Sequence, residues 1–196
     1  MSKDDYTQTD IILIGPISAG KSTVGALLAE KLRMPQLSMD EVRWDYYKEI
    51  GFVEEAQKEI AEKHGFKGLL DYWKPFEAHA VARLLEDHQG YVFDFGAGHS
   101  VYDDEQLFGR VASVLEPYDN VILLLPSPDL DESVRIVRER FLHDHEMDGV
   151  FDGFDLHEYF VRHPSNQRLA KYVVYTDGKS PQETCDEILG LMGRMA

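Results

Sequence analysis

The sequence predicts an α/β fold in which a parallel sheet is covered by helices on both faces. Three observations lead to this prediction. Short apolar runs alternate about five times with stretches of helical periodicity along the 196 residues, which is typical of a parallel sheet. The run Val121 to Leu125 is almost wholly apolar, as expected of a strand buried on both faces. A glycine-containing segment joins the first apolar run to the first helical stretch.

The expected elements follow from periodicity and from glycine and proline breaks. We expect strands at 10–15, 36–39, 91–95, 121–125 and 172–175. We expect helices at 21–33, 41–48, 52–64, 69–88 (with Pro75 as a candidate kink), 103–116, 129–142, 155–170 and 181–195. The acidic segment 143–153 reads as a mobile loop. The prediction is a single domain over 1–196 that begins with a loose tail, 1–9.

Composition limits the classes of function. The chain has 20 Lys and Arg against 36 Asp and Glu, a net charge of −16, and we find no basic patch, so nucleic acid is an unfavourable partner. A single cysteine, Cys185, excludes an internal disulfide and a cysteine zinc cluster. No signal-peptide core or membrane-length apolar run is present. These features predict a cytoplasmic protein that is a monomer or a homodimer.

The segment Gly15-Pro16-Ile17-Ser18-Ala19-Gly20-Lys21-Ser22 fits the pattern G-x-x-x-x-G-K-[ST] of a phosphate-binding loop. Its glycines let backbone N–H groups turn toward phosphate oxygens, Lys21 reaches the β- and γ-phosphates, and the Ser22 hydroxyl suits Mg²⁺. The prediction is therefore a three-layer P-loop NTPase fold rather than a simple glycine-rich turn. The expected nucleotide-binding residues are Gly15, Ser18, Ala19, Gly20, Lys21, Ser22 and Thr23.

Two carboxylates lie where strands are expected to end. Asp40 follows the second strand, and is either a group that accepts a proton from a substrate hydroxyl or an N-cap for the next helix. Asp94 lies within an apolar strand, where a buried carboxylate needs a partner. That partner is either Mg²⁺, as in a Walker B element, or backbone donors or an arginine. We predict metal binding by Ser22 and Asp94.

Three arginines lie on the helix that leads into the acidic segment. A guanidinium that closes over the γ-phosphate stabilises the charge of phosphoryl transfer. We expect Arg135 to contact the nucleotide, and Arg138 and Arg140 to act in catalysis. The alternative for each is surface pairing with Glu132 or Glu139 at helical spacing.

With these motifs in hand, the chain resembles the shikimate kinase branch of the P-loop small-molecule kinases, relatives of adenylate and gluconate kinases. The stretch IILIGPISAGKSTVGALLAEKL carries the most specific match. The family's D-x-D corresponds to Ser38-Met39-Asp40, and its F-R-x-x-E to Trp73-Lys74-Pro75-Phe76-Glu77. Its glycine triplet corresponds to Gly96-Ala97-Gly98, and its R-x-P-x-Y to Arg162-His163-Pro164-Ser165-Asn166.

The resemblance implies a five-stranded parallel sheet, a substrate-binding insertion at 41–88 and a lid at 135–155. It implies ATP, Mg²⁺ and transfer of the γ-phosphoryl group to a hydroxyl. Asp40 matches the acidic residue at the substrate hydroxyl, and Lys74 and Arg162 match two arginines that hold the substrate carboxylate. The expected acceptor-binding residues are Asp40, Arg43, Lys74, Gly96, Ala97, Gly98 and Arg162. The loop Thr176 to Pro181, with Lys179, resembles the one that passes the adenine.

The match to the family breaks at Ser38, Lys74 and Ala97. Lys74 cannot make the planar two-point contact that an arginine makes with a carboxylate. We therefore predict a small-molecule kinase with a rebuilt acceptor pocket and an acceptor other than shikimate. The alternative is an ATP-binding or ATP-hydrolysing regulatory protein without a small-molecule acceptor.

Overall fold

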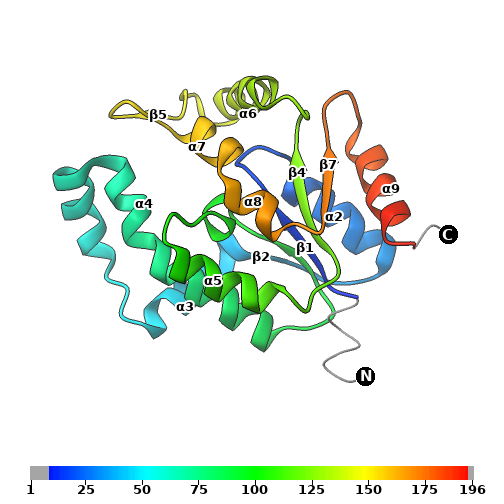
Figure 1. Ribbon diagram of the computed structural model, residues 1–196, viewed down its shortest axis with the longest axis horizontal. Coiled ribbons are helices and arrows are strands. Elements are labelled where there is room, and N and C mark those ends of the chain that lie inside the picture. The colour runs from blue at the N-terminus through cyan, green and yellow to red at the C-terminus, as the bar shows by residue number, and fades with distance from the viewer. Residues whose placement is uncertain (1–8, 194–196) are drawn as a thin grey trace.

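A computed structural model describes residues 9–193, so the expected tail lies outside the described residues except for Thr9. The core is a parallel sheet of five strands in the order β2-β3-β1-β4-β7 (Figure 1). The strands are β1 (Ile11–Ile14), β2 (Gln36–Ser38), β3 (Val92–Asp94), β4 (Val121–Leu125) and β7 (Tyr172–Tyr175). The predicted α/β fold with a five-stranded parallel sheet is confirmed.

The alternation of β1 side chains explains why the sheet is covered on both faces. Ile12 and Ile14 belong to one buried cluster, and Ile11 and Leu13 belong to another. All four side chains are fully buried. Because neighbouring strand residues point to opposite faces, each face requires its own layer of helices.

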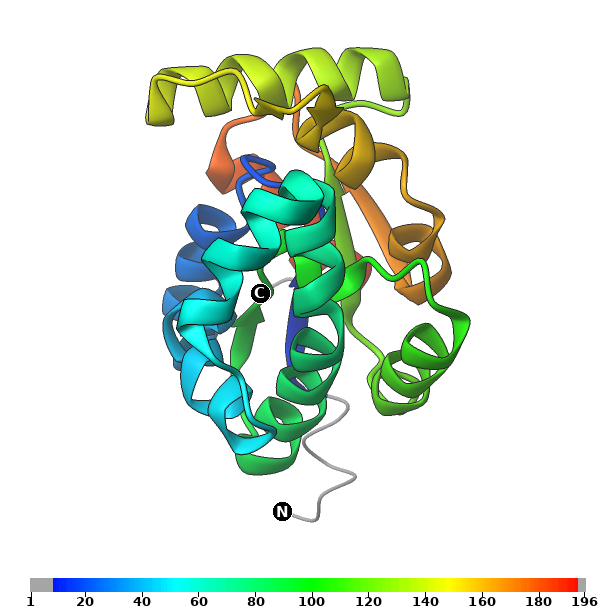
Figure 2. The same cartoon turned by 90° about the vertical axis from the view of Figure 1, so that its left-hand side faces the viewer.

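Helices from distant parts of the chain supply those layers (Figure 1). On one face, α2 (Lys21–Leu32) and α9 (Pro181–Leu191) pack through residues such as Leu28 and Ile188. The opposite face is covered mainly by α3 (Met39–Glu49), α4 (Glu54–Asp87) and α5 (Glu105–Leu115). The remaining helices are η1 (Ala97–Ser100, a 3₁₀ turn), α6 (Leu130–His145), α7 (Leu156–Arg162) and α8 (Pro164–Leu169). In Figure 2, α6 lies across one end of the molecule.

The region 52–88 contains two helices, as predicted, which together carry the label α4, but the candidate kink at Pro75 is not found. The two helices meet at Gly65, where the backbone leaves the helical conformation with φ 68° and ψ −173°. Glycine adopts a positive φ without the steric cost that a Cβ imposes. Pro75 remains inside the helix between the buried residues Lys74 and Phe76, so tertiary packing outweighs the missing N–H at this position.

Within the segment 143–153, predicted to be a mobile loop, only residues 146–149 and the turn 152–153 lie outside a helix or strand. Helix α6 continues to His145, and β5 (Val150–Phe151) pairs with β6 (Phe154–Asp155) as an antiparallel hairpin. Asp152 and Gly153 form its two-residue turn with φ of 51° and 79°, as a type I′ turn requires. The expected helix 155–170 divides at His163 because Pro164 begins a new helix. Among the helices within residues 9–193, none has the length and apolarity to cross a bilayer.

Candidate active site

The predicted phosphate loop connects β1 to α2, so its context agrees with the motif. Gly15 has φ 134°, and a Cβ at this position would lie 2.4 Å from the carbonyl oxygen of Leu124. Only glycine therefore permits the turn against β4. The first turn of α2 contains no acidic residue. The N-terminal end of the helix can therefore direct its N–H groups and its dipole toward an anion.

A cavity of about 920 Å³ lies over this loop. Of the predicted nucleotide-binding residues, Ser18, Ala19, Gly20, Lys21, Ser22, Thr23 and Lys179 line the cavity. Thr176, Pro181 and Thr184 line it beside Lys179. Residues of α3, α4, η1, α6 and α7 complete the wall. The volume is in the range of small-molecule sites.

Lys21 is buried and is held above its own loop. Its Nζ donates to the carbonyl oxygens of Gly15 at 3.0 Å and Pro16 at 2.8 Å. Burial lowers the pKa of the Lys21 ammonium group, although the charges of Asp94 and Asp40 oppose this effect. The carboxylates of Asp40 and Asp94 are therefore close enough to Lys21 for their charges to influence it.

Asp94 ends β3 and is 3% exposed. Burial raises the pKa of its carboxyl group, while Lys21 and a hydrogen bond with Ser22 lower it. Ser22 and Asp94 offer hydroxyl and carboxylate oxygens to the same cavity, which are ligands that Mg²⁺ prefers. Within residues 9–193, no group of three or more His, Cys, Asp or Glu could hold a metal ion.

Asp40 lies in the first turn of α3, not at the end of β2, which stops at Ser38. Its Oδ1 lies 3.0 Å from Nη1 of Arg43, and both residues line the cavity. A Cβ at Gly96 would lie 2.4 Å from the same Oδ1. Glycine at position 96 therefore lets the Asp40 carboxylate approach the loop after β3, although Gly96 itself does not line the cavity.

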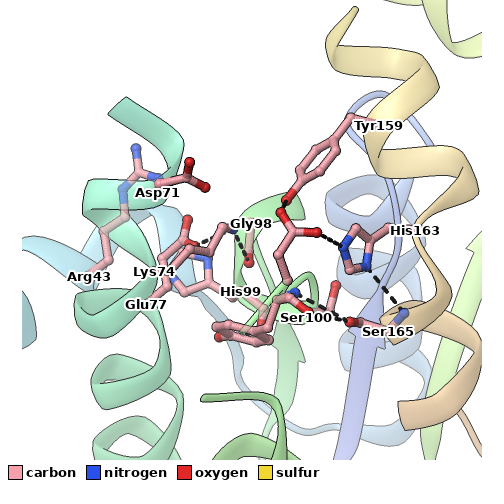
Figure 3. A network of polar contacts seen from close by, with 12 residues as sticks. Arg43, Asp71, Lys74, Glu77, Gly98, His99, Ser100, Tyr159, His163 and Ser165 are labelled. Carbon is pink, nitrogen blue, oxygen red and sulfur yellow. Dashed lines mark hydrogen bonds and ion pairs between the residues drawn. The ribbon is translucent and has the colours of Figure 1, made fainter. Parts of the chain in front are cut away.

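Lys74 is committed to an internal ion pair. Its Nζ lies 2.6 Å from Oε2 of Glu77 and 3.0 Å from the Gly98 carbonyl oxygen, contacts visible in Figure 3. The Lys74 and Glu77 side chains are 7% and 2% exposed. Ala97, Gly98 and Glu77 line the cavity, but Lys74 does not.

Asp103, which follows η1 in the chain, contacts residues of both α4 and α7. Its carboxylate accepts from the Tyr159 hydroxyl at 3.0 Å, contacts His163 Nε2 at 3.1 Å, and pairs with Lys67 Nζ at 3.1 Å. Partial burial raises the pKa of Asp103, but the hydrogen bonds from His163, Lys67 and Tyr159 outweigh it and bring the pKa to about 2. One charged group thus joins α4 to α7.

The structure brings only one of the four predicted arginines of the α6–α7 region into the cavity. Arg140 lines the cavity, and its Nη1 lies 3.4 Å from the Ser18 carbonyl oxygen. Arg135 pairs with Glu132 and Glu139 along its own helix. Arg138 bonds to Asp155. Arg162 pairs with Glu158 at 2.6 Å and with Asp131.

An apolar wall of the cavity was not among the predicted site residues. Phe66, Leu70 and Trp73 contribute from α4, and Leu156 and Phe160 contribute from α7. Phe66 also stacks on Phe151 of the hairpin, with ring centroids 4.3 Å apart. The signal was present in the sequence, because positions 66, 70, 73 and 77 lie on one helical face.

The fold and the site together define a P-loop nucleotide-binding protein whose cavity extends from the phosphate loop to α4 and α7. A family model described as shikimate kinase matches residues 17–192. The chain belongs to the shikimate kinase family.

Individual relatives agree with the family model over nearly the whole chain. A shikimate kinase of Flavobacterium psychrophilum is 23% identical over 184 residues, which cover 91% of this chain and 95% of the relative. One from Alteromonas mediterranea is 27% identical over 94% of this chain and 96% of its own. The solved Acinetobacter baumannii shikimate kinase in complex with shikimate has a TM-score of 0.63 at 22% identity and covers 97% of both chains.

These findings confirm the predicted resemblance and the class of enzyme. The protein is an ATP-dependent small-molecule kinase. The same class is represented among the solved neighbours by a Sinorhizobium meliloti gluconokinase, which shares the fold with a TM-score of 0.53 at 14% identity.

Proposed function

We propose that this protein transfers the γ-phosphoryl group of Mg-ATP to a hydroxyl of a small molecule other than shikimate. The observation that carries the proposal is the state of Lys74 and Arg162, the two residues matched to the carboxylate-binding arginines of the family. Lys74 is neutralised by the buried Glu77. Arg162 is paired with Glu158 and Asp131 and does not line the cavity.

This pairing disfavours a carboxylated acceptor for an electrostatic reason. A carboxylate that leaves water for a largely enclosed site needs a cation to offset its lost hydration. Lys74 would have to give up Glu77, which would then be a buried charge without its partner. Shikimate, bound in the Acinetobacter baumannii neighbour, carries such a carboxylate.

The chemical step uses residues from both sides of the cavity. The acceptor hydroxyl donates its proton to the Asp40 carboxylate as its oxygen forms a bond to the γ-phosphorus. The bond between the γ-phosphorus and the bridging oxygen breaks, and ADP leaves with that electron pair. Lys21 and Arg140 stabilise the negative charge on the transferred group. Arg43 holds Asp40 in place through its 3.0 Å ion pair.

The nucleotide and its metal would be held by the residues around the phosphate loop. Ser22 and Asp94 would hold Mg²⁺, which neutralises phosphate charge when it is bound. We assign Thr176 and Lys179 to the base and sugar side, since both line the cavity beyond α2. The segments 41–88 and 135–155 would act as acceptor-binding insertion and lid, and the Phe66–Phe151 stack supports contact between them.

The test is a phosphotransfer assay with purified protein and Mg-ATP. One reaction contains shikimate, and another contains a metabolite extract of the organism that makes the protein. We expect a phosphorylated product from the extract, absent with Lys21→Ala, and little product from shikimate. Efficient phosphorylation of shikimate would overturn the proposal. ADP release without any phosphorylated product would favour the regulatory alternative.

A further inference from the structure

The paired charges and the aromatic wall on the acceptor side of the cavity narrow the class of acceptor. We propose that the acceptor is an uncharged ring with neighbouring hydroxyl groups, as in a sugar, a cyclitol or a nucleoside. Its apolar face packs on the aromatic wall of α4 and α7, and its hydroxyl edge meets Asp40 and Arg43. This inference rests on the proposed phosphotransfer and specifies its acceptor.

The charges on the acceptor side cancel in pairs. Lys74 and Glu77 neutralise each other at 2.6 Å, and Asp40 and Arg43 do so at 3.0 Å. An anionic acceptor therefore finds no free cation among the residues of this wall, and a cationic acceptor finds no free carboxylate. A neutral ligand avoids the cost of burying an unpaired charge.

The aromatic wall suits the face of a ring. Phe66, Leu70 and Phe160 line the cavity without polar side-chain atoms. The single polar atom of the Trp73 side chain, Nε1, already donates to Oε1 of Gln57 at 3.0 Å. Trp73 therefore offers apolar aromatic surface in a fixed orientation, and such surface packs well against a flat or puckered ring.

The Asp40–Arg43 pair suits the edge of the same ring. A carboxylate accepts a hydrogen bond from one hydroxyl, and a guanidinium donates to the oxygen of a neighbouring hydroxyl. The Arg43 guanidinium lies 4.5 Å from the Trp44 ring and 6.0 Å from the Trp73 ring, which holds it beside the aromatic wall. Its buried Nε has no hydrogen-bond partner within the described residues. The pair can therefore accept and donate at adjacent positions without a net charge.

The first experiment sorts acceptors by charge. A metabolite extract of the producing organism is separated by anion and cation exchange into anionic, cationic and neutral fractions. Each fraction is incubated with enzyme and Mg-ATP, and phosphorylated products that disappear with Lys21→Ala are identified by mass spectrometry. We expect the product to arise from a cyclic polyol in the neutral fraction.

The possible outcomes separate this inference from the proposed function. A product from the anionic or cationic fraction alone, or from an acyclic neutral compound, would overturn the inference and leave phosphotransfer standing. No product from any fraction would overturn the proposed phosphotransfer, and the inference with it.

The second experiment tests the aromatic wall with the acceptor so identified. We expect Trp73→Leu to raise the KM for the acceptor about tenfold, with kcat and the KM for ATP within about twofold, because the ring contact is lost. Trp73→Phe should restore most of the affinity. The matched control is Phe52→Leu, because Phe52 packs on Tyr47, Tyr72 and Phe76 outside the cavity lining.

Circular dichroism must show that all three variants are folded. An unchanged acceptor KM in folded Trp73→Leu, or an equal rise in Phe52→Leu, contradicts the assigned contact.

Discussion

The nucleotide side and the acceptor side of the cavity are built in different ways. The phosphate-binding residues come from one continuous segment between β1 and α2, with Lys21 and Ser22 opening the helix. The acceptor side is assembled from four separate helices, α3, α4, η1 and α7, which lie between Met39 and Arg162. The continuous segment fits the phosphate-loop pattern, whereas the cations beside the assembled wall, Lys74 and Arg162, are held in ion pairs. A wall built from separate elements can change one side chain at a time without disturbing the phosphate loop.

The largest expected effect is at the phosphate loop. Lys21→Ala should lower kcat by about 10³-fold, because the transferred group loses a buried positive charge. Steady-state kinetics with the identified acceptor measures this loss, with Lys31→Ala as the control, since Lys31 pairs with Asp186 and neither residue lines the cavity. Activity within tenfold of the wild type would show that the loop does not act on the phosphates as assigned.

A smaller loss of kcat is expected at Asp40, where the nucleotide side and the acceptor side of the cavity meet. Asp40→Asn keeps the size of the side chain but removes the proton acceptor, so kcat should fall by about 10²-fold. Binding of ATP, measured by calorimetry, should change less than about twofold. Retained turnover in this variant would remove Asp40 from the catalytic role.

The next prediction concerns Asp103, whose charge connects α4 to α7 on the acceptor side. Asp103→Asn weakens the contacts to Lys67, Tyr159 and His163, so the walls of α4 and α7 are less firmly held together. We expect the acceptor KM to rise about fivefold, in keeping with the loss of charge-assisted hydrogen bonds at a half-exposed site. The KM for ATP should not change. A parallel rise in both KM values would indicate general destabilisation instead.

The same residue predicts a dependence of stability on pH. Its pKa is about 2 in the folded protein, against an ordinary value of 3.8. The ionised form therefore stabilises the fold above about pH 4, and this contribution is lost as the pH falls toward about 2. Urea unfolding should show a difference between wild type and Asp103→Asn that shrinks over this interval. A constant difference would mean that the Asp103 charge is not responsible.

The smallest effect is expected at Arg162. Since its side chain is paired on the outside of α7 with Glu158 and Asp131, Arg162→Ala should leave the acceptor KM within about twofold. Kinetics with the identified acceptor provides the measurement. A large rise in KM would show that Arg162 swings into the cavity when the acceptor binds, and would restore the family's carboxylate contact.

Local sequence signals predicted the sheet and the phosphate loop because their causes are local. The apolar run of β4 and the glycine spacing of the loop identify their own structures. The break at Gly65 lies between the two helices predicted for 52–88, whereas the candidate kink at Pro75 is absent, since the buried neighbours of Pro75 keep that turn helical. The dipeptide Asp152-Gly153 is typical of a hairpin turn. The acidic residues around it instead favoured the prediction of a loop.

The acceptor side was harder to predict because its pairings depend on tertiary structure. The spacing of Lys74 and Glu77 permits an ion pair, but only the packing against Gly98 buries it. Arg162 contacts Asp131 of another helix, which no local pattern reveals. The roles assigned to Asp94, Arg140 and Lys179 remain predictions.

The central position of β1 has a consequence for biosynthesis. Ile12 pairs with Phe93 on one side and with Val121 on the other, so β1 is synthesised before both of the strands that pair with it. The phosphate loop at its end cannot adopt its shape before those partners arrive, and such long-range pairing slows folding. Nucleotide binding during synthesis would therefore report that β3 and β4 have paired with β1.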